Sequence, residues 1–121
     1  MGALTSVADD LRAHALALPE AWADSPWEGD NVAKVRRRIF AFLPTDDHGS
    51  LGVKLPTSAG FALTLGAVTP MAYGLGRHGW VTIALGSPTT PDGVLLRDWI
   101  SESYRAIAPR RLAALLSPAG D

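Results

Sequence analysis

Tyr73-Gly74-Leu75-Gly76-Arg77-His78-Gly79-Trp80-Val81-Thr82-Ile83-Ala84-Leu85 is the stretch around which the chain is organised. Three glycines within six residues indicate a tight turn or a close approach to other backbone. From Val81 onward, apolar residues alternate with Thr82 and Ala84, which is the period of a strand with two distinct faces. We therefore expect a strand over 80–85. Its entrance carries a candidate ligand surface made of Tyr73, His78 and Trp80.

The segment 74–79 also matches the glycine pattern of dinucleotide-binding sites letter for letter. That pattern works only when a helix N-terminus follows the glycines and meets the pyrophosphate. Here a strand pattern follows, so we predict no dinucleotide site.

Composition describes an ordinary globular domain. The chain has 121 residues, 47% of them apolar and 19% charged, which suits a single domain over 1–121. Cysteine is absent, so no disulfide, thiolate nucleophile or thiolate metal site can form. His48 beside Asp46 and Asp47 has no second ligand cluster, and we expect no metal or cofactor. No apolar run has the length of a membrane span, and no signal segment is evident, which predicts a cytoplasmic protein without membrane contact.

The remaining elements follow from periodicity and from helix-capping residues. Ser6 is a candidate cap for a first helix that ends before Pro19, with His14 at the edge of its buried stripe. Thr90-Pro91 reads as the start of the longest helix, with Leu96, Ile100, Tyr104 and Ile107 on its buried side. The expected elements are helix 6–18, a connector over 20–30 with room for one short strand, strands 32–35, 38–43 and 51–55, a short helix 58–65, helix 90–108 and further helical turns over 110–116.

Strands 32–35 and 38–43 are expected to pair as a hairpin. Alternation predicts Ile39, Ala41 and Leu43 on one face and Phe40 and Phe42 on the other, so the strand is expected to be central. The hairpin turn belongs to an arginine run, 36–38. Such a run is either a solvated loop or an anion contact.

Three tryptophan side chains each allow two interpretations, as a ligand contact or as part of the core. Trp22 and Trp27 either stack on a ligand or cover an edge of the core, with the indole N–H turned to a polar partner. Trp80 is either part of the ligand surface or simply core.

Short motifs spread along the chain resemble one family. They are Ala17-Leu18-Pro19, Ala33-Lys34-Val35, Ile39-Phe40-Ala41-Phe42, Val53-Lys54-Leu55, Tyr73-Gly74, Gly79-Trp80-Val81, Trp99-Ile100 and Ser103-Tyr104. In this order and spacing the chain resembles the MmcQ/YjbR-like family. The resemblance implies a two-layer α+β fold with an antiparallel sheet packed against helices, in the order α-β(3)-α-β(2)-α, similar to secretion chaperones and frataxin-like domains. Its members are described as DNA-binding proteins with paired hairpins as wings.

This chain departs from the family pattern at two places. Many relatives have glycines at the hairpin tip, where Arg36 and Arg37 stand here. Many also have a Tyr-His-x-Asn-Lys segment where this chain has Tyr73-Gly74-Leu75-Gly76-Arg77, so that only the charge of Arg77 is kept.

The leading functional prediction is weak DNA binding by a basic hairpin wing with little sequence preference. The candidate nucleic-acid contacts are Lys34, Arg36, Arg37, Arg38, Lys54 and Arg77. A net charge of −1 confines such binding to one face. The alternative is a non-enzymatic adaptor or chaperone-like domain with a protein partner or a second copy of itself. An enzyme is not expected, since the sequence offers no nucleophile–base pair, metal cluster or phosphate loop.

Overall fold

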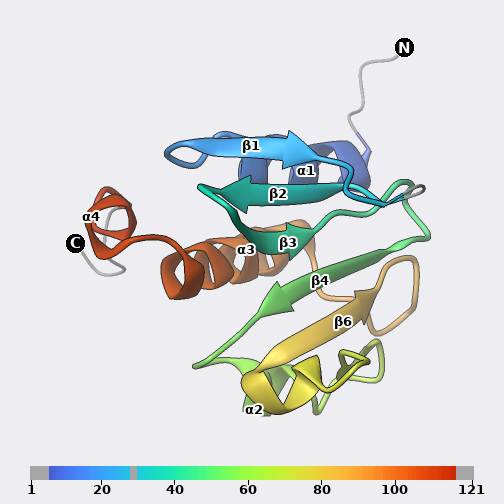
Figure 1. Cartoon of the computed structure of the whole chain (residues 1–121). Coiled ribbons are helices and arrows are strands. Elements are labelled where there is room, and N and C mark those ends of the chain that lie inside the picture. The colour runs from blue at the N-terminus through green and yellow to red at the C-terminus, as the bar shows by residue number, and fades with distance from the viewer. Residues whose placement is uncertain (1–5, 28–29, 117–121) are drawn as a thin grey trace.

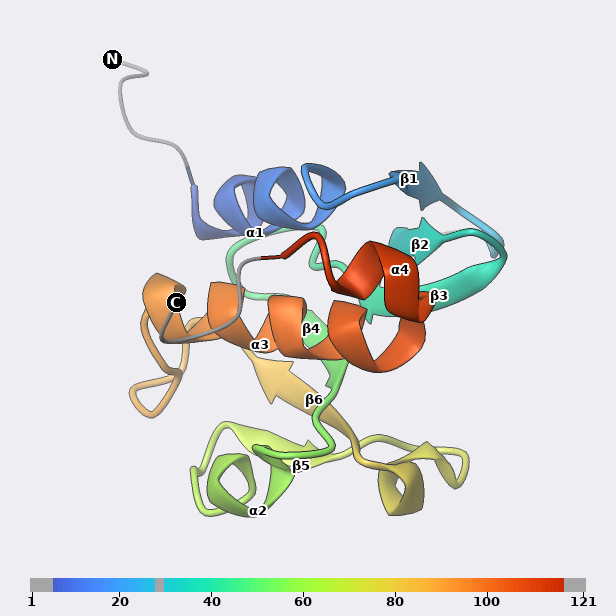
Figure 2. The same cartoon turned by 90° about the vertical axis from the view of Figure 1, so that its left-hand side faces the viewer.

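Six strands form one antiparallel sheet in the order β1-β2-β3-β4-β6-β5 (Figure 1). The computed structural model describes residues 6–27 and 30–116. The strands are β1 (Ala21–Asp24), β2 (Val32–Val35), β3 (Arg38–Phe42), β4 (Ser50–Lys54), β5 (Val68–Pro70) and β6 (Trp80–Ala84). Two long helices, α1 (Val7–Leu16) and α3 (Gly93–Ile107), pack against each other on one face of the sheet (Figure 2). The expected two-layer α+β fold is thereby confirmed.

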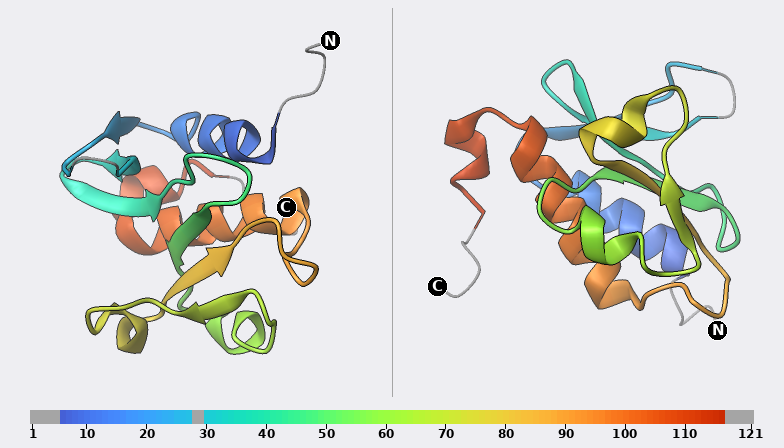
Figure 3. Two further views of the ribbon diagram at one scale, coloured as in Figure 1. Left: turned by 90° about the vertical axis from the view of Figure 1, so that its right-hand side faces the viewer. Right: turned by 90° about the horizontal axis from the view of Figure 1, so that it is seen from below.

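Three short helices complete the described part of the chain. The α2 helix (Ala59–Ala62) and the 3₁₀ helix η1 (Leu75–His78) lie at the β5 edge of the sheet (Figure 3). The α4 helix (Arg110–Ala113) follows the C-terminal end of α3. No helix among the described residues is both long enough and apolar enough to cross a membrane.

The element order contains one strand more than expected. Residues 21–24 form β1, which pairs with β2 so that Ala21 lies opposite Val35 and Asp24 opposite Val32. The order is therefore α-β(4)-α-β(2)-α, with the short strand of the connector counted as a full member of the sheet.

Helix boundaries follow the capping side chains. Ser6 begins α1 as expected, because its Oγ accepts a hydrogen bond from the Asp9 N–H at 3.1 Å. The prediction for α3 was wrong by two residues at its start, since Thr90 was expected to be the N-cap. Asp92 is the cap and accepts from the Leu95 N–H at 3.0 Å, whereas the Thr90 hydroxyl donates to the Ala84 carbonyl at 2.7 Å and stabilises the preceding turn.

A β-bulge changes the faces of β3. The register with β2 shifts between Ala33 and Lys34, so Ile39 lies opposite Lys34 while Ala41 lies opposite Ala33. Phe40 and Ala41 are consequently both fully buried in the main core, and Ile39 and Phe42 are only partly buried. The expected strict alternation along this strand was wrong, because a bulge places two successive residues opposite one partner residue.

The core lies between the sheet and the two long helices. Phe40 meets Tyr104 of α3 edge to face, with ring centroids 5.2 Å apart. The predicted buried positions of α3 are confirmed, and Trp99 and Ser103 join them. His14 is half-buried at the boundary, as expected, and its ring Nε2 lies 2.9 Å from Ser101 Oγ. Burial of this imidazole, with the Arg97 charge nearby, lowers the pKa of His14.

The organising stretch is a short helix held between two left-handed glycines. Gly74 has φ 79° and Gly79 has φ 92°, conformations that are easily reached only without a side chain. Strand β6 follows directly, as the alternation predicted, so the glycine pattern has no helix N-terminus behind it.

Candidate functional site

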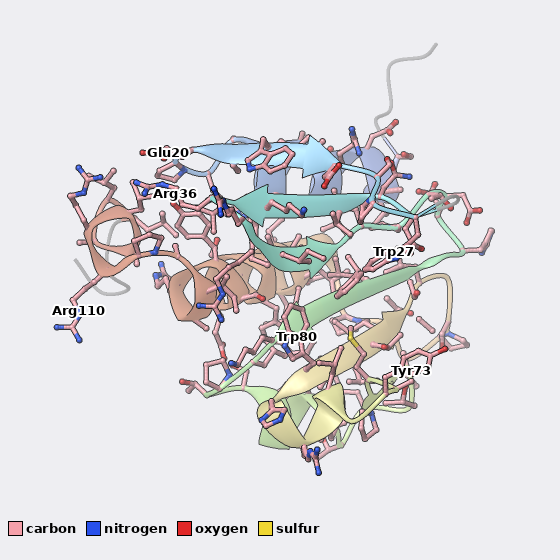
Figure 4. All side chains as sticks on the ribbon, viewed as in Figure 1. Glu20, Trp27, Arg36, Tyr73, Trp80 and Arg110 are labelled. Carbon is pink, nitrogen blue, oxygen red and sulfur yellow. The ribbon has the colours of Figure 1, made fainter. Side chains whose placement is uncertain are left out.

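The strongest concentration of exposed positive charge is at the end of the sheet where β2 turns into β3. Arg36, Arg37 and Arg38 stand at this turn, and all three are exposed. The α4 helix contributes Arg110 and Arg111, also exposed. Figure 4 shows Arg36 and Arg110 at the same end of the molecule. We call these five residues the arginine end.

Four of the five guanidinium groups are available to a ligand. Arg36 pairs with Glu20, with Nε 2.8 Å from Oε1. Arg37, Arg38, Arg110 and Arg111 form no ion pair with any described carboxylate. Within the described part of the chain, four charges of the arginine end therefore have no ion-pair partner.

The backbone fixes the direction in which the hairpin tip presents its charges. Arg36 has φ 56° in the turn, a left-handed conformation that a non-glycine residue adopts at a cost. The indole N–H of Trp22 donates to the Arg36 carbonyl at 2.9 Å and holds the turn in place. Trp22 thus turns its N–H to a polar partner, as one of its two interpretations required.

The two candidate lysines lie elsewhere on the sheet. Lys34 Nζ is 2.7 Å from Asp24 Oδ2 and 5.2 Å from the centroid of the Trp22 ring. The hydrogen bond from Lys34 holds the pKa of Asp24 below its usual value. Lys54 lies on β4 opposite Trp80 and is partly buried. Lys34 is consequently neutralised by its neighbour, as Arg36 is by Glu20, whereas the other four arginines pair with no described carboxylate.

The residues at the entrance to β6 are spread over different environments. Trp80 is buried, 8% exposed, with its ring centroid 5.6 Å from that of Phe42. Tyr73 is 99% exposed. Arg77 and His78 are exposed on η1, at the β5 edge. Trp80 therefore belongs to the core, whereas Tyr73, Arg77 and His78 are at the surface.

Sequence reasoning missed Arg110 and Arg111. A signal for them exists, since two adjacent arginines follow a helix-ending proline, Pro109. That signal says nothing about a hairpin more than 70 residues earlier, because only the packed fold places α4 at the same end.

The opposite end of the sheet is acidic. Hydrogen bonds from Ala8 to Asp47, from Leu43 to Asn31 and from Leu85 to Gly49 bring several connections together there. The described segments at this end, 6–10, 24–27, 30–31, 43–50 and 85–93, contain seven aspartates and neither lysine nor arginine. We call this the acidic end. Part of its charge stabilises helices, since Asp47 and Asp92 accept from N-terminal amides of α1 and α3.

The described residues contain no candidate metal centre. They contain no group of three histidine, aspartate or glutamate side chains arranged to hold a metal ion. In the groove beside α3, the Glu102 carboxylate accepts from the amides of Thr57 and Ser58 and from the Ser58 hydroxyl. It therefore caps the turn that precedes α2.

Comparison with known proteins identifies the fold and the family. The crystal structure of Deinococcus radiodurans protein DR2400, whose family-model domain is DUF419, matches with a TM-score of 0.66 at 26% identity. The match covers 82% of this chain and 76% of that one. None of the curated proteins matches the chain significantly. The YjbR family model matches residues 16–106, which is most of the chain and includes the arginine hairpin. The chain therefore belongs to the YjbR family.

Proposed function

We propose that this protein is a non-enzymatic, cytoplasmic nucleic-acid-binding protein that contacts the phosphate backbone through its arginine end. The observation that supports the proposal is the convergence of two separate elements. The β2–β3 turn and α4 present Arg37, Arg38, Arg110 and Arg111 at one end, none paired with a described carboxylate.

Guanidinium groups suit phosphate because their planar fork of donors matches its oxygens. Four uncompensated arginines correspond to about four phosphate contacts. The acidic end disfavours any approach of a polyanion from the other side, so we expect one orientation on the nucleic acid.

The arrangement favours backbone contact over base reading. The α4 helix has four described residues, too few to lie along a major groove. We therefore expect little sequence preference.

A salt series on duplex DNA tests the proposal. Neutralising about four phosphates predicts a slope of log K against log salt of about −3.6, hence an affinity loss of about a hundredfold between 50 and 200 mM salt. The variants Arg37→Gln/Arg38→Gln and Arg110→Gln/Arg111→Gln should each flatten the slope by about 1.8. If either pair binds like the parent protein, that element does not contact phosphate.

Two single variants serve as controls. Arg77→Gln removes an exposed charge at the β5 edge, away from the arginine end, and should leave the slope unchanged. Glu20→Gln releases Arg36 from its ion pair and should make the slope steeper by about 0.9, since a fifth arginine becomes available. An Arg77 effect as large as that of the arginine pairs would contradict the proposed site.

A protein partner is the second candidate function. Phe61 and Leu63 are exposed on and directly after α2, far along the sheet from the arginine end. An adaptor would bury such residues against its partner. Sedimentation velocity over a range of concentrations, repeated with Phe61→Ser, would reveal a homodimer that depends on this surface.

A further inference from the structure

A pocket opens on the face of the sheet that the long helices leave uncovered. Its volume is about 690 Å³, enough for a small organic molecule. It lies where β3, β4 and β6 approach the acidic end, and its lining includes Trp27, Asp30, Phe42, Met71 and Tyr73. In Figure 4, Trp27 and Tyr73 lie on the same side of the molecule with β4 between them.

The floor of the pocket is closed by close packing. Gly52 lies between Phe42 and Met71, and a Cβ there would stand 3.1 Å from Phe42 Cβ and 2.5 Å from Met71 Cε. The absence of that side chain lets an aromatic ring and a thioether form one continuous apolar floor. Phe42 is held there by its edge contact with the buried Trp80 ring.

Two large aromatic side chains stand exposed at the mouth. Trp27 is 57% exposed and Tyr73 is 99% exposed, although both residue types are usually well covered in a folded domain. The Asp30 N–H donates to the Trp27 carbonyl at 3.1 Å, so these two lining residues lie close together. The pocket lining thus includes two exposed aromatic side chains and one carboxylate.

The charge of the lining selects the ligand class. Asp30 is the only acidic or basic side chain among the described lining residues, and the surrounding acidic end has no lysine or arginine. Phosphates and carboxylates are disfavoured at such a site, which sets it apart from the arginine end. A cation gains from the carboxylate, and also from the negative faces of the aromatic rings if its hydration is weak.

We propose that this pocket binds an organic cation with a methylated ammonium head. The head lies between Trp27 and Tyr73 beside Asp30, and its apolar substituents rest on Phe42 and Met71. A primary ammonium is less suitable, because the apolar floor cannot replace the hydrogen bonds that such a group makes with water. The methylated head belongs either to a free small molecule or to a modified lysine side chain of a protein.

Three probes of similar size separate charge from shape: choline, its neutral isostere 3,3-dimethylbutan-1-ol, and ethanolamine. Titrations followed by NMR shifts of the indole N–H signals should show saturable binding of choline, about tenfold tighter than either other probe. Equal affinity for choline and the neutral alcohol would overturn the proposal, as would no saturation by choline up to about 100 mM. A short peptide carrying trimethyllysine forms a further arm, and tighter binding of that peptide than of choline identifies a protein as the source of the head group.

Matched variants locate the site. Trp27→Leu and Tyr73→Leu should each weaken choline binding at least fivefold while leaving the thermal melting temperature unchanged, since both side chains are exposed. Asp30→Asn should weaken it several-fold and reduce its salt dependence. Trp22→Leu is the control, because Trp22 is 44% exposed but lies outside the pocket lining. An equal loss in Trp22→Leu, or none in Trp27→Leu, would place the cation elsewhere. Duplex DNA binding should be unchanged in Trp27→Leu, Tyr73→Leu and Asp30→Asn, so this proposal and the proposed function fail independently.

Discussion

Ser103 is the one fully buried polar residue among those described, and it joins three elements. Its Oγ donates to the Phe40 carbonyl of β3 at 2.6 Å and accepts from the Lys54 N–H of β4 at 2.8 Å. The pairing of the two strands ends at Ala41 opposite Val53. Phe40 and Lys54 are the next residues beyond that pair, one on each strand. A hydroxyl from α3 therefore takes the place of a direct bond between the strands.

Replacing Ser103 by alanine should leave a buried carbonyl and a buried amide without partners. We expect a loss of about 2 kcal/mol in the free energy of unfolding, because each unsatisfied buried group costs about 1–3 kcal/mol before the structure relaxes. Urea denaturation measures this loss. Ser101→Ala is the matched control, since Ser101 bonds the half-buried His14, and it should cost less than about 1 kcal/mol. Equal losses in the two variants would mean that the Ser103 hydroxyl does not bridge the strands.

At the scale of elements, α4 buries little apolar surface against the rest of the domain. Of its four residues only Leu112 is buried. Leu112→Ala should release α4 while the rest of the domain stays folded, because peripheral segments unfold locally at low free energy. Hydrogen exchange of the 112–114 amides should accelerate. DNA affinity should also fall toward that of the Arg110→Gln/Arg111→Gln variant, although no charge has been removed.

The control for α4 is Leu115→Ala. Leu115 is 65% exposed, so its truncation should change neither hydrogen exchange nor affinity. Full DNA affinity in Leu112→Ala would show that the position of α4 does not matter for binding.

The elements show how far the sequence is informative. Strand β6 and the left-handed glycines before it were predictable because alternation and glycine act locally. The bulge in β3 was not, since alternation describes a regular strand. The bulge buries Phe40 beside Ala41, and Phe40 there contacts Tyr104 of α3, 64 residues later in the sequence. The start of α3 was misplaced because Thr90 and Asp92 are both competent caps, and the bond from Thr90 to Ala84 decides between them.

The placement of charge in the whole molecule also depends on contacts between residues far apart in the sequence. The hairpin arginines were predicted as an anion contact from their own run of charge, and Lys34 was included because Asp24 was not known to lie beside it. Arg110 and Arg111 became part of the candidate site only through the packing of α4. Charge composition is a property of the sequence, whereas charge placement is a property of the fold.

The separation of the arginine end from the acidic end should be visible in ion-exchange chromatography. With a net charge of −1, a molecule with evenly spread charges would not be retained by a cation exchanger at pH 7. We expect retention on both a cation and an anion exchanger at low salt, because each resin meets a surface of opposite sign. The variant with Arg37, Arg38, Arg110 and Arg111 all changed to glutamine should lose only the cation-exchange retention. Passage of the parent protein through the cation exchanger would contradict the separation.

A molecule built in this way has a large dipole moment despite its small net charge. At distances beyond the molecular diameter, the monopole weakly repels a nucleic acid, and the dipole exerts a torque that turns the arginines toward it. Under the proposed function, orientation would therefore precede contact, and fewer encounters would be wasted on the wrong face. The association rate constant should for this reason rise as salt is lowered, even though the net charges of protein and DNA have the same sign.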